Sequence, residues 1–444
     1  MSAVTAPALD PVTLLGELIR FNTVNPPGNE RPAAEHLAAV LRDAGFEVSL
    51  YAATEQRPNV VARLRGTDDG PTLCLLSHID TVLADPDAWS HDPWSGELID
   101  GFVWGRGALD MKSQTAAEVA AAASLARSGW RPAHGDLLVV CVVDEEVGGA
   151  LGAEWICEHH PDSVRCDMLL NEGGGWRAEL DGGQALYGVG CAEKGVFRFK
   201  VITRGVAGHA SIPRMGENAL LAMAPLLARL AERQPTMQLV QEPRALLEAL
   251  GESTEDPAGA VARLRGRDPM LALVVEPMCG VSLAPTRILA SEKINVIPSR
   301  AELRVDCRVP PGLGEVEARA AAEEVLGREG YELEFTERVM GNRSPIEGPF
   351  MDRIKEWIAA NDPGALCAPS VLPGFTDSRT FRAAFPDLVA YGFFPHRHMT
   401  IAGTWPLIHG ADERIDVRDL QFATRFYGDI AQAVLGGDAR EERR

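Results

Sequence analysis

Two spacings of apolar residues alternate along the first part of the chain. Helical spacing marks three segments, and short unbroken apolar runs between them mark three strands. The predicted helices cover residues 10–21, 33–44 and 115–128, and the predicted strands cover 59–64, 72–76 and 137–143. The last of these strands is almost wholly apolar and β-branched, which is typical of a strand buried on both faces. Strands that alternate with helices predict an α/β domain with a mixed, largely parallel sheet flanked by helices.

The pattern changes after residue 195. Apolar and polar residues now alternate one by one, as in strands with one exposed face, and helices separate these strands. The strands are predicted at 196–204, 300–309 and 331–337, and the helices at 218–232 and 315–328. This order indicates a smaller, open-faced α+β domain inserted into the first one. We therefore predict a catalytic domain in two parts, 1–194 and 339–444, interrupted by a lid or dimerisation domain at 195–338.

Composition narrows the class of protein. The 444 residues include 43 Lys and Arg against 63 Asp and Glu, which gives a net charge of −20. A polyanion would be repelled, so general nucleic-acid binding is not expected. With 46% hydrophobic residues, a chain of this length can bury a large core, which excludes a disordered polymer.

Cysteine use and the start of the chain indicate the compartment. The 8 cysteines are scattered, with no C-x-x-C pair, so we expect buried, reduced thiols. Asp10, Glu17 and Arg20 interrupt the first apolar stretch, which favours an amphipathic helix over a signal peptide. No stretch has the apolar length of a membrane span. These features predict a cytoplasmic protein.

Residue types that bind metals follow several of the apolar strands. These residues are His78 and Asp80 in LCLLSHIDTV, Asp110 in WGRGALDMK, Asp144, Glu145 and Glu146 in LLVVCVVDEEVGG, Glu172 in MLLNEGGG, and His409 in PLIHGADE. Taken singly, each has a simpler explanation, such as a hydrogen-bonded core histidine or a solvated turn. Together they place several carboxylates after strands that are expected to be buried, where charge is costly unless it is paired or bound to metal. Histidines and carboxylates without thiolates suit zinc or a similar divalent ion.

Eight motifs in order carry a resemblance to a known family. The stretches SHID, GRGALDMK, DEEVGG, NEGGG, GHAS, NVIPSRAELRVDCR, GFTDSR and HGADE resemble those of the zinc-dependent aminoacylase and carboxypeptidase family, the M-twenty metallopeptidases. Acetylornithine deacetylase, succinyl-diaminopimelate desuccinylase and glutamate carboxypeptidase belong to this family. The resemblance runs over nearly the whole chain, and it implies a catalytic α/β domain interrupted by a smaller α+β lid through which two copies dimerise.

The resemblance implies a role for each catalytic-domain residue. Asp110 would bridge two divalent ions, most simply Zn²⁺, with Co²⁺ or Mn²⁺ as alternatives. His78 and Glu172 would complete the site of one ion, and Glu146 and His409 the site of the other. Asp80 would hold the His78 ring, and Glu145 would act as the general base.

Further residues are implied to contact the substrate. His209, in the lid, would donate a hydrogen bond to the developing oxyanion in a neighbouring subunit. Asn295, Arg308, Gly374 and Thr376 match positions that bind substrate. The structural alternatives to these functional roles are that His209 caps a turn and that Arg308 forms an ordinary ion pair.

Two positions depart from the family pattern. Ser113 and Phe375 stand where the family usually has glycine, and Phe375 could re-line the substrate pocket. The expected activity is hydrolysis of an amide or peptide bond next to a free carboxylate, in N-acyl amino acids or small peptides. A dedicated biosynthetic deacylase and a non-catalytic metal-binding relative are the alternatives.

Overall fold

The computed structural model describes residues 8–436 and divides the chain into two compact units. Unit 1 comprises the chain up to Cys191, together with residues 344–370 and the part from Phe375 onward. Unit 2 comprises Ala192–Arg343 and Val371–Gly374. The predicted domain boundaries at 195 and 338 stay a prediction.

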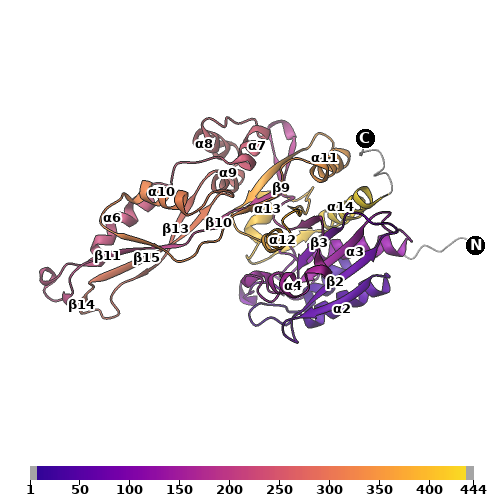
Figure 1. Ribbon diagram of the computed structural model, residues 1–444, viewed down its shortest axis with the longest axis horizontal. Helices are drawn as coiled ribbons and strands as arrows, with labels where there is room; N and C mark the ends of the chain where they lie inside the picture. Colours follow the sequence, from indigo (N-terminus) through magenta and orange to yellow (C-terminus); the bar gives the residue numbers. More distant parts are fainter. Residues whose placement is uncertain (1–7, 437–444) are drawn as a thin grey trace, which may run out of the picture. The chain divides into compact units, whose positions relative to one another are not determined.

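A ten-stranded sheet forms the centre of unit 1 (Figure 1). Its main order is β1-β2-β6-β3-β7-β19-β9-β17, and β8 and β18 also pair with β9. The strands are β1 (Glu47–Ala52), β2 (Pro58–Arg65), β3 (Leu73–His78), β6 (Asp136–Val142), β7 (Met168–Asn171), β8 (Arg177–Glu179), β9 (Ala185–Glu193), β17 (Asn342–Arg343), β18 (Leu366–Leu372) and β19 (Val389–Gly392). The central pairs β6–β3, β3–β7 and β7–β19 are parallel, and the flanking pairs are antiparallel. The expected α/β fold with a mixed sheet is confirmed.

Helices cover both faces of this sheet. They are α1 (Pro11–Arg20), α2 (Arg31–Asp43), α3 (Lys112–Arg127), α4 (Ala153–His159), α5 (Pro161–Val164), α11 (Pro349–Asn361), α12 (Ser378–Ala384), α13 (Ile401–Thr404) and α14 (Val417–Leu435). In β6, Leu137, Val139 and Cys141 pack into the core beneath α1, α3 and α14, whereas Leu138 and Val140 pack into the core beneath α4 and α12. This double burial explains why the β6 sequence is apolar at consecutive positions. A small sheet of β4 (Leu98–Ile99), β5 (Phe102–Trp104) and β20 (Arg414–Asp416) accompanies it.

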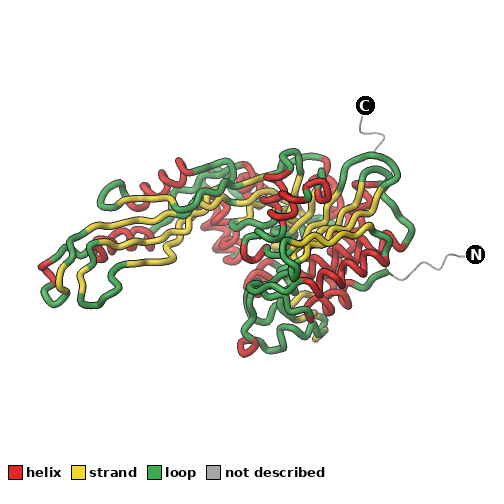
Figure 2. Tube along the Cα trace, turned by 60° about the horizontal axis from the view of Figure 1, so that its bottom comes forward, coloured by secondary structure: helices red, strands yellow, loops and turns green. Residues whose placement is uncertain are grey.

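Unit 2 contains a five-stranded antiparallel sheet whose long strands lie side by side in Figure 2. The strands are β10 (Gly195–Val196), β11 (Phe199–Arg204), β13 (Ser282–Leu289), β15 (Arg300–Val309) and β16 (Glu332–Phe335). Helices α6 (Ala219–Glu232) and α10 (Glu315–Leu326) bury one face of this sheet. Ion pairs such as Arg204–Glu332 and Lys200–Glu334 occupy the other face, as the one-by-one alternation predicted.

Several elements were not expected from the sequence. Unit 2 also contains α7 (Gln241–Ala249), α8 (Pro257–Arg267), α9 (Pro269–Val275), the strand β13, and a two-stranded ribbon of β12 (Gly208–His209) and β14 (Val296–Ile297). In unit 1, Arg177–Glu179 form β8 by pairing with the following strand β9. A segment of three residues is too short to show a strand pattern in the sequence.

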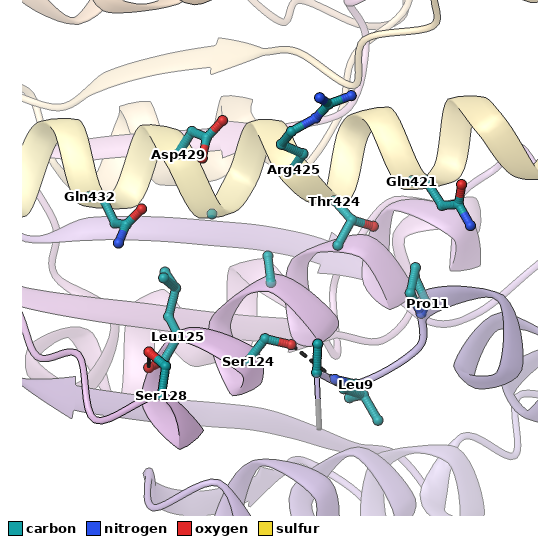
Figure 3. A pocket seen from close by; sticks show the side chains of 13 residues that line it. Leu9, Pro11, Ser124, Leu125, Ser128, Gln421, Thr424, Arg425, Asp429 and Gln432 are labelled. Atoms are coloured by element: carbon teal, nitrogen blue, oxygen red, sulfur yellow. Dashed lines mark hydrogen bonds between the residues drawn. The ribbon is translucent and has the colours of Figure 1, made fainter. Parts of the chain in front are cut away.

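A groove of about 410 Å³ lies between α3, α14 and the start of the described chain. In Figure 3, Gln421, Arg425 and Gln432 come from α14, Leu125 comes from α3, and Ser128 directly follows α3. The backbone N–H of Leu9 donates to Ser124 Oγ across 3.0 Å. The groove lies at the far end of α3, about 18 Å along the helix from its start next to Asp110. None of its lining residues is a predicted site residue.

Candidate active site

The carboxyl ends of three parallel strands bring the predicted ligands together. His78 is the last residue of β3, Glu172 directly follows β7, and Glu145 and Glu146 lie in a single 3₁₀ turn after β6. Because β3 pairs in parallel with both β6 and β7, these three strand ends meet at one edge of the sheet. Asp110 lies on the turn before α3, and His409 lies on the loop before β20.

Asp110 stands between the two histidines. His78 Nε2 lies 3.2 Å from Asp110 Oδ1, and His409 Nε2 lies 3.1 Å from Asp110 Oδ2. Glu172 Oε1 is 3.7 Å from His78 Nε2, and Glu146 Oε2 is 3.3 Å from His409 Nε2. Each oxygen of Asp110 therefore faces one of the two histidines. Each histidine in turn lies close to one further carboxylate, Glu172 for His78 and Glu146 for His409.

The donor atoms suit divalent cations. His78 forms one compact group of potential ligand atoms with Glu145 and Glu172, and a second one with Asp110 and Glu146. Glu146 Oε1 is buried and has no hydrogen-bond partner among the described residues. Imidazole nitrogens and carboxylate oxygens are ligands that zinc and similar ions accept. The residues present thus fit two neighbouring cations.

Burial and mutual repulsion perturb the acids of this cluster. Burial raises the pKa of Glu145 well above its usual range, and the Glu172 charge raises it further. Burial and the Asp110 charge likewise raise the pKa of Glu172. Such crowding of carboxylates is unfavourable unless a positive charge compensates it, and perturbed groups of this kind mark functional sites.

The pKa values of the two histidines are also raised, but here the cause is the neighbouring carboxylates. Hydrogen bonds to Asp110 and Glu146 raise the pKa of His409 to about 10. Burial lowers the pKa of His78, but Asp110 and Asp80 outweigh burial and hold it well above its usual value. Burial raises the pKa of Asp110, but the hydrogen bonds from His409 and His78 outweigh it and lower that pKa.

Two buried carboxylates hold the ligand-bearing loops. Asp80 lies beneath His78, with 3.5 Å between Asp80 Oδ1 and His78 Nδ1. Glu413, which is fully buried, accepts hydrogen bonds from the backbone N–H groups of Leu109 and Asp110 at 2.6 and 2.9 Å. Arg106 pairs with Glu413 at 2.5 Å and donates to the carbonyl of Gly410, so it links the Asp110 turn to the His409 loop.

Thr376 and Asp377 lie in unit 1. Thr376 Oγ1 accepts a hydrogen bond from Asn171 Nδ2 at 3.2 Å, next to Glu172. The charge of Asp377 also raises the pKa values of Glu145 and Glu172, although burial is the largest cause in both. Asp377 was not among the predicted site residues; its place in the GFTDSR motif is the signal that could have identified it.

The other four candidates lie in unit 2. His209 and Asn295 are neighbours, because β12 pairs with β14 and the Ala210 N–H donates to the Asn295 carbonyl. Ser211 Oγ lies 2.7 Å from His209 Nδ1. Arg308 lies on β15, where its Nε donates to Asp306 at 2.8 Å. Gly374 belongs to the short segment that clusters with unit 2.

Comparison with known proteins identifies the family. Residues 74–433 match the model of Peptidase family M20/M25/M40. The chain belongs to this family. The resemblance drawn from its eight motifs is therefore confirmed, and the M20 chain is a hydrolase of the metallopeptidase type.

Relatives and solved structures agree with this assignment. An N-fatty-acyl-amino acid synthase/hydrolase of Xenopus tropicalis is 27% identical over 377 residues, covering 81% of this chain and 71% of that protein. A succinyl-diaminopimelate desuccinylase of Cereibacter sphaeroides is 32% identical over 237 residues, but the match covers only 51% of this chain and 57% of that enzyme. An M20 family metallo-carboxypeptidase from Sulfolobus solfataricus has the same fold, with a TM-score of 0.69 at 16% identity over 96% of this chain and 99% of that one.

Proposed function

We propose that this M20 hydrolase uses two divalent ions to cleave an amide or peptide bond next to a free carboxylate. The observation that carries the proposal is Asp110, whose two oxygens each face one histidine and whose neighbours are Glu172 on one side and Glu146 on the other. His78, Asp110 and Glu172 would hold one ion, and Asp110, Glu146 and His409 the other. We propose zinc as the metal, with cobalt or manganese as alternatives.

Individual side chains have separate roles in the proposed reaction. Bound divalent ions would polarise the scissile carbonyl and acidify the attacking water. Glu145 is placed to take a proton from the attacking water and to deliver it to the leaving nitrogen. Asp80 fixes the orientation of the His78 ring. His209 donates to the developing oxyanion, and Asn295, Arg308, Gly374 and Thr376 bind the substrate.

We propose that two copies associate through unit 2. Strand β13 pairs only with β15 among the described strands, so its other edge is available for pairing. Ile288 and Leu289 on this strand and Leu220 and Leu221 on α6 are exposed. An exposed strand edge beside exposed apolar side chains is typical of an interface. Sedimentation of the wild type and of an Ile288→Asp, Leu221→Asp variant tests the proposed association. Equal masses for the two proteins would contradict an interface at β13 and α6.

A cytoplasmic location is also proposed. All 8 cysteines are free, as expected in a reducing compartment. No helix among residues 8–436 is long and apolar enough to cross a membrane.

The first experiment is a hydrolysis screen of the zinc-reconstituted protein. The panel contains N-acetyl, N-succinyl and N-fatty-acyl amino acids together with dipeptides, and Glu145→Gln serves as the blank. Turnover by the wild type that Glu145→Gln lacks, with both metals still bound, supports the proposed reaction and base. Turnover that survives in Glu145→Gln would show that the base is assigned incorrectly.

The same panel tests a second candidate, a deacylase dedicated to one biosynthetic intermediate. The similarity to succinyl-diaminopimelate desuccinylase over about half of the chain favours this alternative. A steep preference for one N-succinyl or N-acetyl substrate would support it, whereas activity spread over many acyl groups would support the broader function. No hydrolysis with two ions bound would favour the non-catalytic relative.

A further inference from the structure

A buried guanidinium contacts Asp144, the residue that precedes the two acids Glu145 and Glu146. Arg57 precedes β2 and is 8% exposed. Its Nη2 and Nε donate to the two oxygens of Glu30 at 2.5 and 2.9 Å. Its Nη1 donates to Asp144 Oδ1 at 2.6 Å. One side chain thus joins the start of α2 to the residue immediately before Glu145.

Asn25 continues this connection. Its Nδ2 donates to Asp144 Oδ1 at 3.1 Å and to Asp80 Oδ2 at 2.8 Å. One amide group therefore uses both of its hydrogens to hold two carboxylates that would otherwise repel each other. Asn25, Asp80 and Asp144 are all buried.

The two carboxylates in turn fix the backbone of the acid turn. Asp80 accepts hydrogen bonds from the N–H groups of Glu145 and Glu146, both at 3.2 Å. Asp144 accepts one from the N–H of Leu151 at 3.0 Å. Asp144 has a φ of +72°, an uncommon conformation for a residue other than glycine. The hydrogen bonds of the Asp144 side chain hold its backbone in this conformation. Asp144 thereby fixes the start of the turn that carries Glu145 and Glu146.

The segment from Asn25 to Glu30 is shaped to enclose Arg57. Both of its ends contact this network, and Gly28 in its middle has a φ of +74°. A Cβ atom at Gly28 would overlap the Arg57 guanidinium. The backbone therefore approaches the cation more closely than any side chain would allow.

We propose that Arg57 and Asn25 are positioning residues for the general base Glu145 and the metal ligand Glu146. This inference rests on the proposed function for the roles of those two acids. Arg57 neutralises Asp144 and Glu30, and Asn25 couples Asp144 to Asp80, so the turn stays in place beneath a cluster of like charges. Loss of either contact would let the turn move, even though neither residue touches a metal or the substrate. Partners of this kind typically change metal affinity or activity by about 10- to 100-fold.

The test compares Arg57→Met and Asn25→Ala with Arg63→Met. Arg63 lies on β2 and is half-buried; it pairs with Asp136 at 2.6 Å, at the opposite end of β6 from the acid turn. The three full-length variants and the wild type are titrated with Zn²⁺ by calorimetry. kcat and KM are then measured on the best substrate from the screen, and thermal unfolding is recorded for each protein.

A positioning role predicts that Arg57→Met and Asn25→Ala weaken Zn²⁺ affinity or lower kcat about 10- to 100-fold, with KM changed less than about threefold. Arg63→Met should lower thermal stability only. If Arg57→Met does not fold, Asn25→Ala carries the test, because it leaves the Arg57–Glu30 pair intact. Metal affinity and kcat within about threefold of the wild type in a folded Asn25→Ala or Arg57→Met would overturn the inference. A wild type that binds none of Zn²⁺, Co²⁺ and Mn²⁺ would instead overturn the proposed function, and this inference with it.

Discussion

A buried acid that takes no part in the proposed chemistry offers a quantitative test of the structure. Glu118 lies on α3 in unit 1 and is fully buried. Gln114 Nε2 donates to its Oε1 at 2.9 Å, and no described cation pairs with it. Burial raises the pKa of Glu118 from its ordinary value of 4.5 to about 8. We therefore predict that Glu118 is protonated in the folded protein at neutral pH.

The magnitude follows from proton linkage. Between pH 4.5 and about 8, the unfolded chain releases this proton while the folded chain keeps it. The contribution of Glu118 to the free energy of unfolding is thus complete below pH 4.5 and falls as the pH rises. The slope is ~1.4 kcal/mol per pH unit, so the stability lost is about 3 kcal/mol at pH 7 and about 4 kcal/mol at pH 8. Glu118→Gln has no proton to lose, so this contribution stays constant in the variant.

Urea unfolding of metal-free wild type and Glu118→Gln between pH 4.5 and 8 measures this difference. Groups that titrate in both proteins, such as the histidines of the site, cancel when the two curves are subtracted. The variant should gain stability relative to the wild type as the pH rises, by about 3 kcal/mol at pH 7. Glu35→Gln, at an exposed position of α2, is the control and should show no such gain. A difference that does not change with pH would refute the reasoning, because Glu118 would then ionise equally in the folded and unfolded states.

Three further predictions concern the site. Asp110→Ala should lose both metal ions, and an unchanged content of two ions by mass spectrometry would reject a bridging role. His209→Ala should lower kcat about 100- to 1,000-fold with little change in KM, whereas a change confined to KM would indicate substrate binding instead. Glu413→Ala should lower the free energy of unfolding by about 3–5 kcal/mol, because it leaves the buried Arg106 uncompensated; a loss below about 1 kcal/mol in urea unfolding would contradict the bracing role.

Much of the fold could be predicted because burial and local pattern agree there. The predicted helix at 10–21 is α1, where the Asp10 side chain accepts hydrogen bonds from the N–H groups of Val12 and Thr13. The predicted strand at 137–143 is β6, which is buried on both faces. Helices α7–α9 were not predicted, although their residues are common in helices. Their segment lies between clearer strand signals, and three short helices leave a weaker periodicity than one long helix.

The candidate site, like the fold, contains residues that the sequence could predict and residues that it could not. The proposed ligands could be selected from the sequence because each follows an apolar strand or lies in a recognisable motif. The residues behind them could not, because their partners lie far away in the sequence. Arg57 meets Asp144 after 87 intervening steps along the chain, and Arg106 meets Glu413 after 307. A lone arginine or glutamate in a sequence gives no sign that it will be buried, since most such residues are exposed.

The pairing of β19 with β7 has a consequence for the nascent chain during translation. Val389 pairs with Met168, so roughly 220 residues must be synthesised after β7 before β19, its second parallel neighbour besides β3, exists. At about 5–20 residues per second, translation of that stretch takes on the order of 10–40 s. During this interval the nascent polypeptide already carries Glu145, Glu146 and Glu172 but lacks His409, which emerges later still. With His409 as a proposed ligand, an unfinished chain lacks a complete metal site, so the proposed hydrolysis would become possible only as translation nears completion.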